Sequence, residues 1–269
     1  MAPQENIALS EKVEARLVRD LWANAPAAAA AEIGYEVETV GDCVISGAAH
    51  DTSILVNRTL CLDSLAPEAQ PDVAKQAMET YTRLGVGKYF IHINPGAPGN
   101  LTDYLAENDM KKGRAWMKFV RDVSPITPPE TSLIIKEIDT SDAQAFGQIV
   151  APCFDMSPAF GRILAAAVPL ENWHVFMAFE DGKPAGAGCL VTHEGVGLLD
   201  MGATHTDFRR RGVQGAVMAA RINKAAELGL NMLFTETGEA VEGEAQHSYG
   251  NILRYGFKEM YARQNYMPA

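Results

Sequence analysis

Hydrophobic and polar residues alternate along the first 123 residues with spacings that predict a mixture of helices and strands. Apolar residues recur every three or four positions between residues 10 and 31, which is typical of helices, and Pro26 marks the start of a second one. The elements expected after this pair are a strand over 36–45 with a turn at Gly41 and Asp42, a strand over 54–62, a helix over 67–84, a strand over 88–94, a short helix over 101–107 and a strand over 114–121.

A similar order of elements returns after the proline-rich stretch Ser124–Pro129, where closely spaced prolines favour extended backbone. The expected elements are a strand over 133–138, helices over 142–153 and 157–167, strands over 174–179, 185–192 and 197–203, a helix from near Gly212 to Leu228, a strand over 231–237 and a short helix ending at Gly256. We therefore predict an α/β (α+β) fold with two related domains, residues 1–123 and 132–269, each a mixed central sheet flanked by helices. Residues 124–131 are the expected linker.

The stretch before the helix at Gly212 has the composition of an anion-binding loop. It contains three arginines and two glycines in the run Arg209, Arg210, Arg211, Gly212, Val213, Gln214, Gly215 and Ala216. The first N–H groups of a helix have no partners within the helix, and they carry the positive end of its dipole. Arginine adds a fork of donors that matches phosphate oxygens. The stretch predicts a pyrophosphate site; a solvated basic turn is the alternative.

This stretch and its flanks resemble the GNAT superfamily of acyl-CoA-dependent N-acyltransferases. The central motif of that family, Arg/Gln-x-x-Gly-x-Gly/Ala between a strand and a helix, is matched at Arg209 and Gly212, while Gln214 departs from it. Residues 248–257 are similar to a second family signature, a short helix with an Asn that ends in Gly-Phe. The resemblance implies that residues 209–216 bind acetyl-CoA, and that Ser248 and Asn251 contact its pantetheine arm or adenosine end.

Transfer of an acyl group from a thioester to an amine also needs a polarised carbonyl and a base. The resemblance places the carbonyl donors in the backbone near Ala203 and Thr204. Asp200, on the same strand, and Glu236, on the strand after the helix, are the two base candidates, and each is otherwise an ordinary strand-end charge. The threonines that flank Glu236 favour it narrowly, since they indicate a polar strand end.

The acid for the leaving thiolate is less well indicated. Many family members have a tyrosine four residues before the Gly-Phe pair, where this chain has Ile252; Tyr255, Tyr249 and Ser248 lie on the neighbouring helix face, and Tyr255 is the candidate that we carry forward. The resemblance implies that the acceptor lies against Phe154, Asp155, Met156, Trp173 and residues 244–247.

Composition limits the other function classes. The 269 residues include 23 basic and 34 acidic side chains, a net charge of −11, and both halves are acidic, which argues against nucleic acid and therefore against an aminoacyl-tRNA donor. The four cysteines have no metal-ligand spacing, so no metal is expected. No apolar run has membrane-spanning length and no signal peptide is seen, which predicts a cytoplasmic protein that does not bind membranes.

The first half lacks the chemistry of the second. Residues 63–68 are acidic at the position where the second half has its arginines, so a pyrophosphate there would meet negative charge. The sequence thus predicts a tandem protein with a degenerate N-terminal half. Its expected activity is acetyl transfer from acetyl-CoA directly to a primary amine of a small molecule or peptide. The alternative function is a non-catalytic acyl-CoA sensor. For the oligomeric state, a homodimer is the assembly that we consider.

Overall fold

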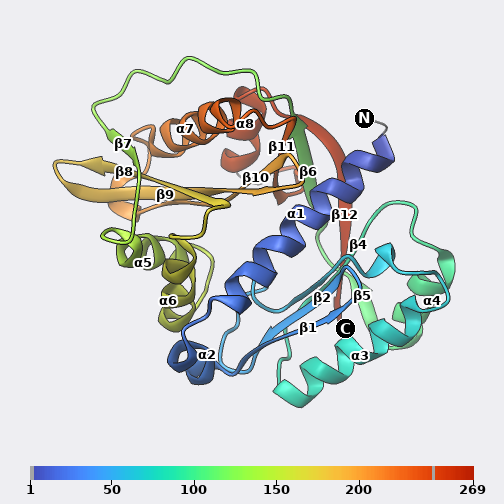
Figure 1. Cartoon of the computed structure of the whole chain (residues 1–269). Helices are drawn as coiled ribbons and strands as arrows, with labels where there is room; N and C mark the ends of the chain where they lie inside the picture. The colour runs from blue at the N-terminus through green and yellow to red at the C-terminus, as the bar shows by residue number, and fades with distance from the viewer. Residues whose placement is uncertain (1–2, 244–245) are drawn as a thin grey trace.

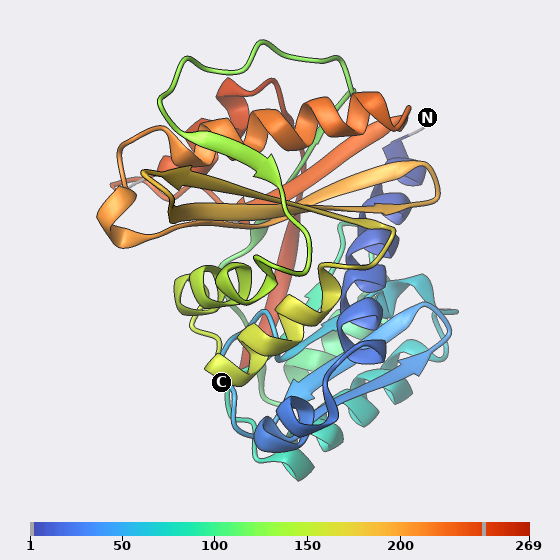
Figure 2. The same cartoon turned by 60° about the vertical axis from the view of Figure 1, so that its left-hand side comes forward.

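The computed structural model describes residues 3–243 and 246–269. Within these residues, the strands form one sheet in the order β1-β2-β3-β4-β12-β6-β11-β10-β9-β8-β7, and β5 pairs with β12 outside that path. Helices cover both faces of this sheet, and the two halves of the chain lie one beside the other (Figures 1 and 2). The predicted mixed fold with two related halves is confirmed.

The N-terminal half contains a five-strand portion of the sheet between two helical layers. Its helices are α1 (Pro3–Ala23), α2 (Ala27–Ile33), α3 (Gln70–Leu84) and α4 (Gly99–Glu107), with a 3-10 turn η1 (Leu62–Ser64); its strands are β1 (Tyr35–Val40), β2 (Cys43–Ala48), β3 (Arg58–Leu60), β4 (Phe90–Ile93) and β5 (Met110–Lys112). Val73, Ala77 and Tyr81 of α3 lie one turn apart and are buried against Ile91 and Leu101. Helices α3 and α4 therefore share one core, and α1 belongs to another.

The C-terminal half repeats this plan with a longer sheet. Its helices are α5 (Ala143–Cys153), α6 (Pro158–Ala167), α7 (Val213–Glu227) and α8 (His247–Arg254), with a 3-10 turn η2 (Thr206–Phe208); its strands are β6 (Trp116–Arg121), β7 (Ile134–Glu137), β8 (Trp173–Glu180), β9 (Lys183–His193), β10 (Val196–Thr204), β11 (Met232–Gly238) and β12 (Lys258–Pro268). Helices α5 and α6 touch through backbone, because a Cβ on Gly147 would lie 2.0 Å from the Gly161 carbonyl oxygen. They cover the sheet face opposite α7 and α8 (Figure 1).

The two halves exchange strands at the middle of the sheet. Strand β6, from the first 123 residues, pairs with β11, and β12, from the end of the chain, pairs with β4, β5 and β6. The segment between β6 and β7 has no regular structure and is fixed to α7 by two hydrogen bonds between Asn223 and the Ile126 backbone, of 2.8 and 3.0 Å. The domain boundaries at 123 and 132 stay a prediction, and in space each half includes a strand from beyond them.

The structure departs most from the expected pattern at β3 and β12. The strand expected over 54–62 is shorter and consists of β3 alone. It starts after Asn57, because the Asn57 side chain turns back to the preceding loop and donates to the Asp51 carbonyl at 2.6 Å. The segment expected over 36–45 is the β1–β2 hairpin, and its turn is at Gly41, with φ 57°, where the sequence predicts one. The hydrophobic pattern does not predict β12, since its inward-facing residues include the charged Arg263 and the amide Asn265, both fully buried.

Candidate active site

The sheet of the C-terminal half opens between β10 and β11. The two strands pair in parallel only from Val196 to Leu198 on β10 and from Met232 to Phe234 on β11. The Thr235 hydroxyl donates to the Leu199 carbonyl at 2.8 Å and closes the paired part. Beyond this point β11 continues beside β6 while β10 continues beside β9, which leaves a gap between β10 and β11.

A β-bulge lies on the β10 side of this gap. The regular pairs Asp200–Cys189 and Ala203–Ala187 are separated by two residues on β10 and one on β9, and Met201 has φ 53°. The Asp200 carboxylate accepts the Met201 N–H at 2.6 Å. The predicted carbonyl donors at Ala203 and Thr204 therefore directly follow an irregularity that turns the backbone.

The arginine loop leads from the end of β10 through η2 to the start of α7. Gly212 is the N-cap of α7 with φ 80°, and Arg210 has φ 64°, so two of the four residues from 209 to 212 adopt left-handed conformations. The helix runs over 15 residues, and no side chain hydrogen bond caps its first turn. Because the loop precedes this end, the predicted anion site lies at the positive end of a full-length helix.

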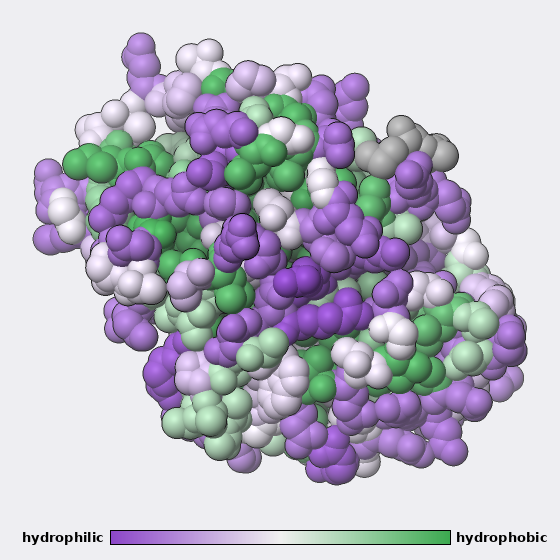
Figure 3. All heavy atoms as spheres, in the orientation of Figure 1, coloured by the Kyte–Doolittle hydropathy of each residue, from purple (hydrophilic) through white to green (hydrophobic). Residues whose placement is uncertain are grey.

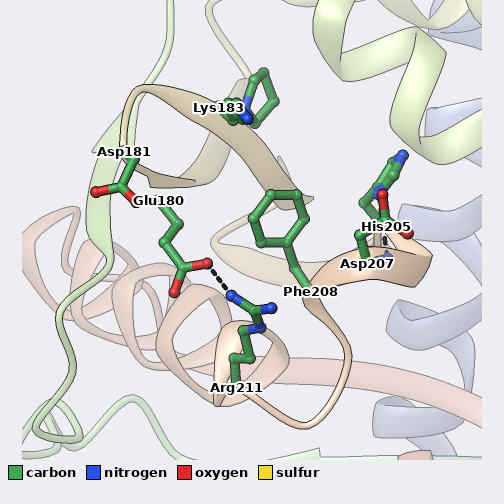
Figure 4. Close-up of a pocket in the computed structure, with 8 residues that line it drawn as sticks. Glu180, Asp181, Lys183, His205, Asp207, Phe208 and Arg211 are labelled. Atoms are coloured by element: carbon green, nitrogen blue, oxygen red, sulfur yellow. Dashed lines mark hydrogen bonds and ion pairs between the residues drawn. The ribbon is translucent and has the colours of Figure 1, made fainter.

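Arg211 lies in a cavity of about 480 Å³ between this loop and the β8–β9 turn (Figure 4). Its guanidinium forms an ion pair with Glu180 and lies 5.4 Å from the centre of the Phe208 ring. Lys183 and His205 also line the cavity. One of the three loop arginines is therefore already paired with a carboxylate of the same half.

Helix α8 brings the second sequence signature against the start of α7. Asn251 donates to the Gln214 side chain at 2.6 Å and accepts from Arg254 at 2.8 Å. A Cβ on Gly215 would lie 2.4 Å from the Tyr255 hydroxyl, so the tyrosine rests on the first turn of α7. Burial raises the pKa of the Tyr255 phenol, which Arg254 opposes. Ser248 lies one turn before Asn251 on α8.

Glu236 faces a buried cluster of charges between the two halves. Its carboxylate lies 2.8 Å from the Lys118 Nζ and 2.9 Å from an Arg263 Nη2. Glu14 of α1 lies 2.5 Å from Lys118, 2.6 Å from Arg263 and 2.5 Å from Arg58. We call these residues, with Glu11, the charge cluster: Glu11, Glu14, Arg58, Lys118, Glu236 and Arg263. It contains three carboxylates and three basic side chains, so its formal charges balance.

The charge cluster shifts the acidities of its members. Burial raises the pKa of the Glu14 carboxyl, but Arg263, Lys118 and Arg58 outweigh it and hold that pKa well below its ordinary value. For Glu236 burial prevails and raises the pKa, although Arg263 and Lys118 oppose the shift. The base candidate is thus a buried carboxyl with an increased proton affinity, tied to two cations.

A family model for GNAT acetyltransferases matches residues 145–253. This part of the chain is therefore similar to GNAT acetyltransferases, and we refer to it as the GNAT domain. No curated protein matches the sequence. Among solved structures, a GCN5-related N-acetyltransferase from Kribbella flavida is similar, with a TM-score of 0.61 at 14% identity over 94% of both chains.

Two other solved structures show how far the likeness extends. A tandem GNAT protein from the clavulanic acid biosynthesis pathway has a TM-score of 0.55 at 14% identity over 99% of this chain and 95% of its own. A GCN5-related N-acetyltransferase from Sphaerobacter thermophilus has a TM-score of 0.59 at 12% identity over 78% of this chain and 70% of its own. At such identities the likeness concerns the fold alone, and it includes the fold of the N-terminal half.

The N-terminal half has a parallel strand pair of its own, β3 with β4, but different chemistry follows it. Asp63 in η1 accepts the Asn94 backbone N–H at 2.7 Å, and burial raises the pKa of its carboxyl to about 6. A cavity of about 190 Å³ beside it is lined by Glu11, Asp63 and Cys61 among others. This lining has two carboxylates and one lysine, Lys12, in contrast with the three arginines of the loop in the GNAT domain.

A loop of the N-terminal half reaches the expected acceptor side of the GNAT domain. Ser53 donates to the Phe154 carbonyl at 2.6 Å, and Asp51 accepts the Ser157 N–H at 2.8 Å. Trp173 donates to Asp20 of α1 at 3.0 Å. Glu244 and Ala245, also expected to line the acceptor, lie outside the described residues. Polar side chains gather where the two halves meet (Figure 3).

Sequence reasoning missed the charge cluster apart from Glu236. Two charged residues at positions that the hydrophobic pattern places inside could have indicated it. Glu14 shares the buried stripe of α1 with Leu17 and Leu21, and Lys118 lies at an inward position of β6. Within residues 3–243 and 246–269, no group of three or more His, Cys, Asp or Glu side chains is placed to hold a metal ion. No helix over the same residues is long and apolar enough to cross a bilayer.

Proposed function

We propose that the chain is an N-acetyltransferase that moves an acetyl group from acetyl-CoA directly to a primary amine of a small molecule or peptide. The observation that carries the proposal is the convergence of four features beside the gap between β10 and β11: the bulge, the arginine loop, the start of α7, and Asn251 of α8 with Tyr255, which follows that helix. The family match supports acyl transfer in general.

In this reaction the amine nitrogen attacks the thioester carbonyl, the C–S bond breaks, and the thiolate leaves as a thiol once protonated. The pyrophosphate of acetyl-CoA lies at the α7 N-terminus, where helix N–H groups and Arg209 stabilise its charge. Backbone N–H groups near Ala203 and Thr204 stabilise the negative charge that develops on the carbonyl oxygen. This arrangement orients the carbonyl toward the gap.

Two side chains handle the protons in this proposal. An amine has an ordinary pKa of about 10, so a base must take its proton at neutral pH. Glu236 is on the β11 side of the gap, and its raised pKa makes it a better acceptor than an ordinary carboxylate. Tyr255, whose hydroxyl rests on α7, gives a proton to the thiolate.

The test is a thermal shift with acetyl-CoA followed by turnover over an amine panel with free-thiol detection. At about 100 times its dissociation constant a ligand adds roughly 2.7 kcal/mol, which we expect as a rise of about 5 °C in Tm. The double variant Arg209→Glu/Arg211→Glu is expected to lose that rise. The matched control is Lys75→Glu/Lys88→Glu, which makes the same charge change on exposed residues of the N-terminal half.

A non-catalytic acyl-CoA sensor is the second candidate. It is favoured by Ile252, which replaces the tyrosine of many family members, and by the ion pairs that hold Glu236. Binding of acetyl-CoA with no thiol release across the amine panel supports the sensor. Thiol release that depends on an added amine supports the transferase.

A further inference from the structure

Arg221 is a buried cation whose contacts are all with backbone carbonyls. The side chain lies on the inner face of α7 and is 2% exposed. Its Nη1 donates to the carbonyl oxygens of Cys189 at 3.1 Å and Asp200 at 3.0 Å, and its Nε donates to Val217 at 3.3 Å. No ion pair within the described part of the chain includes it. A buried guanidinium without a carboxylate is costly and needs a reason.

The two carbonyls on β9 and β10 identify that reason. Asp200 and Cys189 form the last regular pair before the bulge, and one guanidinium nitrogen bonds both of them. Gly188, opposite the bulge on β9, leaves room for the guanidinium, because a Cβ there would lie 2.7 Å from the Arg221 Cζ; a Cβ on Gly202 would make an ordinary contact of 3.7 Å with Nη2. Arg221 therefore fixes the point at which the regular pairing of β9 and β10 is interrupted.

The same residue connects the bulge to the cofactor end of α7. Arg221 lies eight residues after Val213, so about 12 Å of rigid helix separates it from the first turn. Movement of α7 is thereby coupled to movement of Asp200, and the bulge leads directly into Ala203 and Thr204. Burial lowers the pKa of Arg221 to about 10, so the guanidinium beside the Cys189 and Asp200 carbonyls stays charged at neutral pH.

We propose that Arg221 is a positioning residue for acyl transfer, which holds the β10 bulge in register with α7 so that the backbone donors at Ala203 and Thr204 meet the thioester carbonyl. The inference rests on the proposed function, since it assigns a role in that reaction. It separates two tasks that α7 performs: its first turn binds the cofactor, and Arg221 sets the strand that acts on the acetyl group.

The test compares Arg221→Gln and Arg221→Lys with Ile222→Ala. Ile222 is the adjacent residue of α7 and is fully buried in a core cluster with Leu199, so its truncation destabilises the helix but removes no hydrogen bond to the Cys189 and Asp200 carbonyls. We expect Arg221→Gln to lower kcat about a hundredfold, as loss of an oxyanion donor does. Arg221→Lys keeps the charge but loses the planar set of guanidinium N–H donors, so it should retain a larger share of the wild-type kcat than Arg221→Gln. The Kd of acetyl-CoA should change less than threefold in all three variants.

A second measurement does not depend on catalysis. Hydrogen exchange of the ligand-free protein over residues 199–205 should be faster in Arg221→Gln than in Ile222→Ala. Equal kcat and equal exchange in these two variants, with an active wild type, would overturn the inference alone. A parallel loss of kcat and acetyl-CoA affinity would do the same, since it indicates a general structural role. A wild type that neither binds acetyl-CoA nor releases thiol overturns the proposed function and this inference together.

Discussion

Glu14 is the anion on which the charge cluster depends most, and its neutralisation is the sharpest test of how the two halves are held together. Its carboxylate is fully buried and lies within 2.6 Å of Arg58, Lys118 and Arg263. These cations come from β3, β6 and β12, whereas Glu14 comes from α1. Glu14→Gln keeps the shape of the side chain but leaves three buried cations with two carboxylates.

The expected cost follows from burial. Removing one partner of a buried ion pair typically costs about 3–5 kcal/mol, because the remaining charge is left without compensation in a medium that cannot solvate it. At about 2.1 cal/mol/K of unfolding entropy per residue, each kcal/mol lowers the Tm of a 269-residue chain by about 2 °C. We therefore expect Glu14→Gln to lower Tm by about 5–9 °C.

The assay is thermal unfolding followed by circular dichroism between pH 2 and pH 8, a range that extends well below the ordinary carboxyl pKa. Because the pKa of Glu14 is held well below its ordinary value, its contribution is present above about pH 4.5 and is lost as the pH falls through the lower folded pKa. The difference between wild type and Glu14→Gln should therefore shrink on acidification below about pH 4.5.

The matched control is Glu32→Gln, which removes an exposed carboxylate from its pair with Arg162. Exposed pairs contribute little, so its Tm should stay within about 1 °C of wild type. If Glu14→Gln falls in the same range as Glu32→Gln, or if its effect is independent of pH, the cluster does not hold the halves through charge, and the reasoning is refuted.

Three further outcomes are expected. Glu236→Gln should lower turnover at neutral pH by about a hundredfold, with partial recovery at high pH and little change in acetyl-CoA affinity. Normal turnover in both Glu236→Gln and Asp200→Asn would exclude a carboxylate base. Because burial raises the pKa of Glu236, the acid limb of the wild-type rate profile should lie above the ordinary carboxyl range, which a rate measurement between pH 4 and pH 8 would reveal. Gly215→Ala should weaken acetyl-CoA binding, because the added Cβ would lie 2.4 Å from the Tyr255 hydroxyl, and Tyr255→Phe in that background should restore part of the affinity. A Gly215→Ala variant with wild-type affinity would contradict this contact.

The sequence by itself determined the features that depend on neighbouring residues. The helix that begins after Gly212 and the loop of arginines before it can be read from local composition, because glycine conformations, helix ends and charge are local properties. The strands on either side follow from their short apolar runs. The same reasoning identifies the two signatures of the GNAT domain, and the structure brings them together through Asn251 and Gln214.

Only the tertiary structure decided how the two halves share one sheet. Strand β12 carries Arg263 and Asn265 on its buried side, so its pattern does not predict a core strand, and its place between β4 and β6 depends on carboxylates that lie about 250 residues earlier in the chain. The partners of Glu236 and the two carbonyls held by Arg221 also come from separate strands and helices. Such contacts are non-local, and a buried charge gains its partner only when the chain has folded.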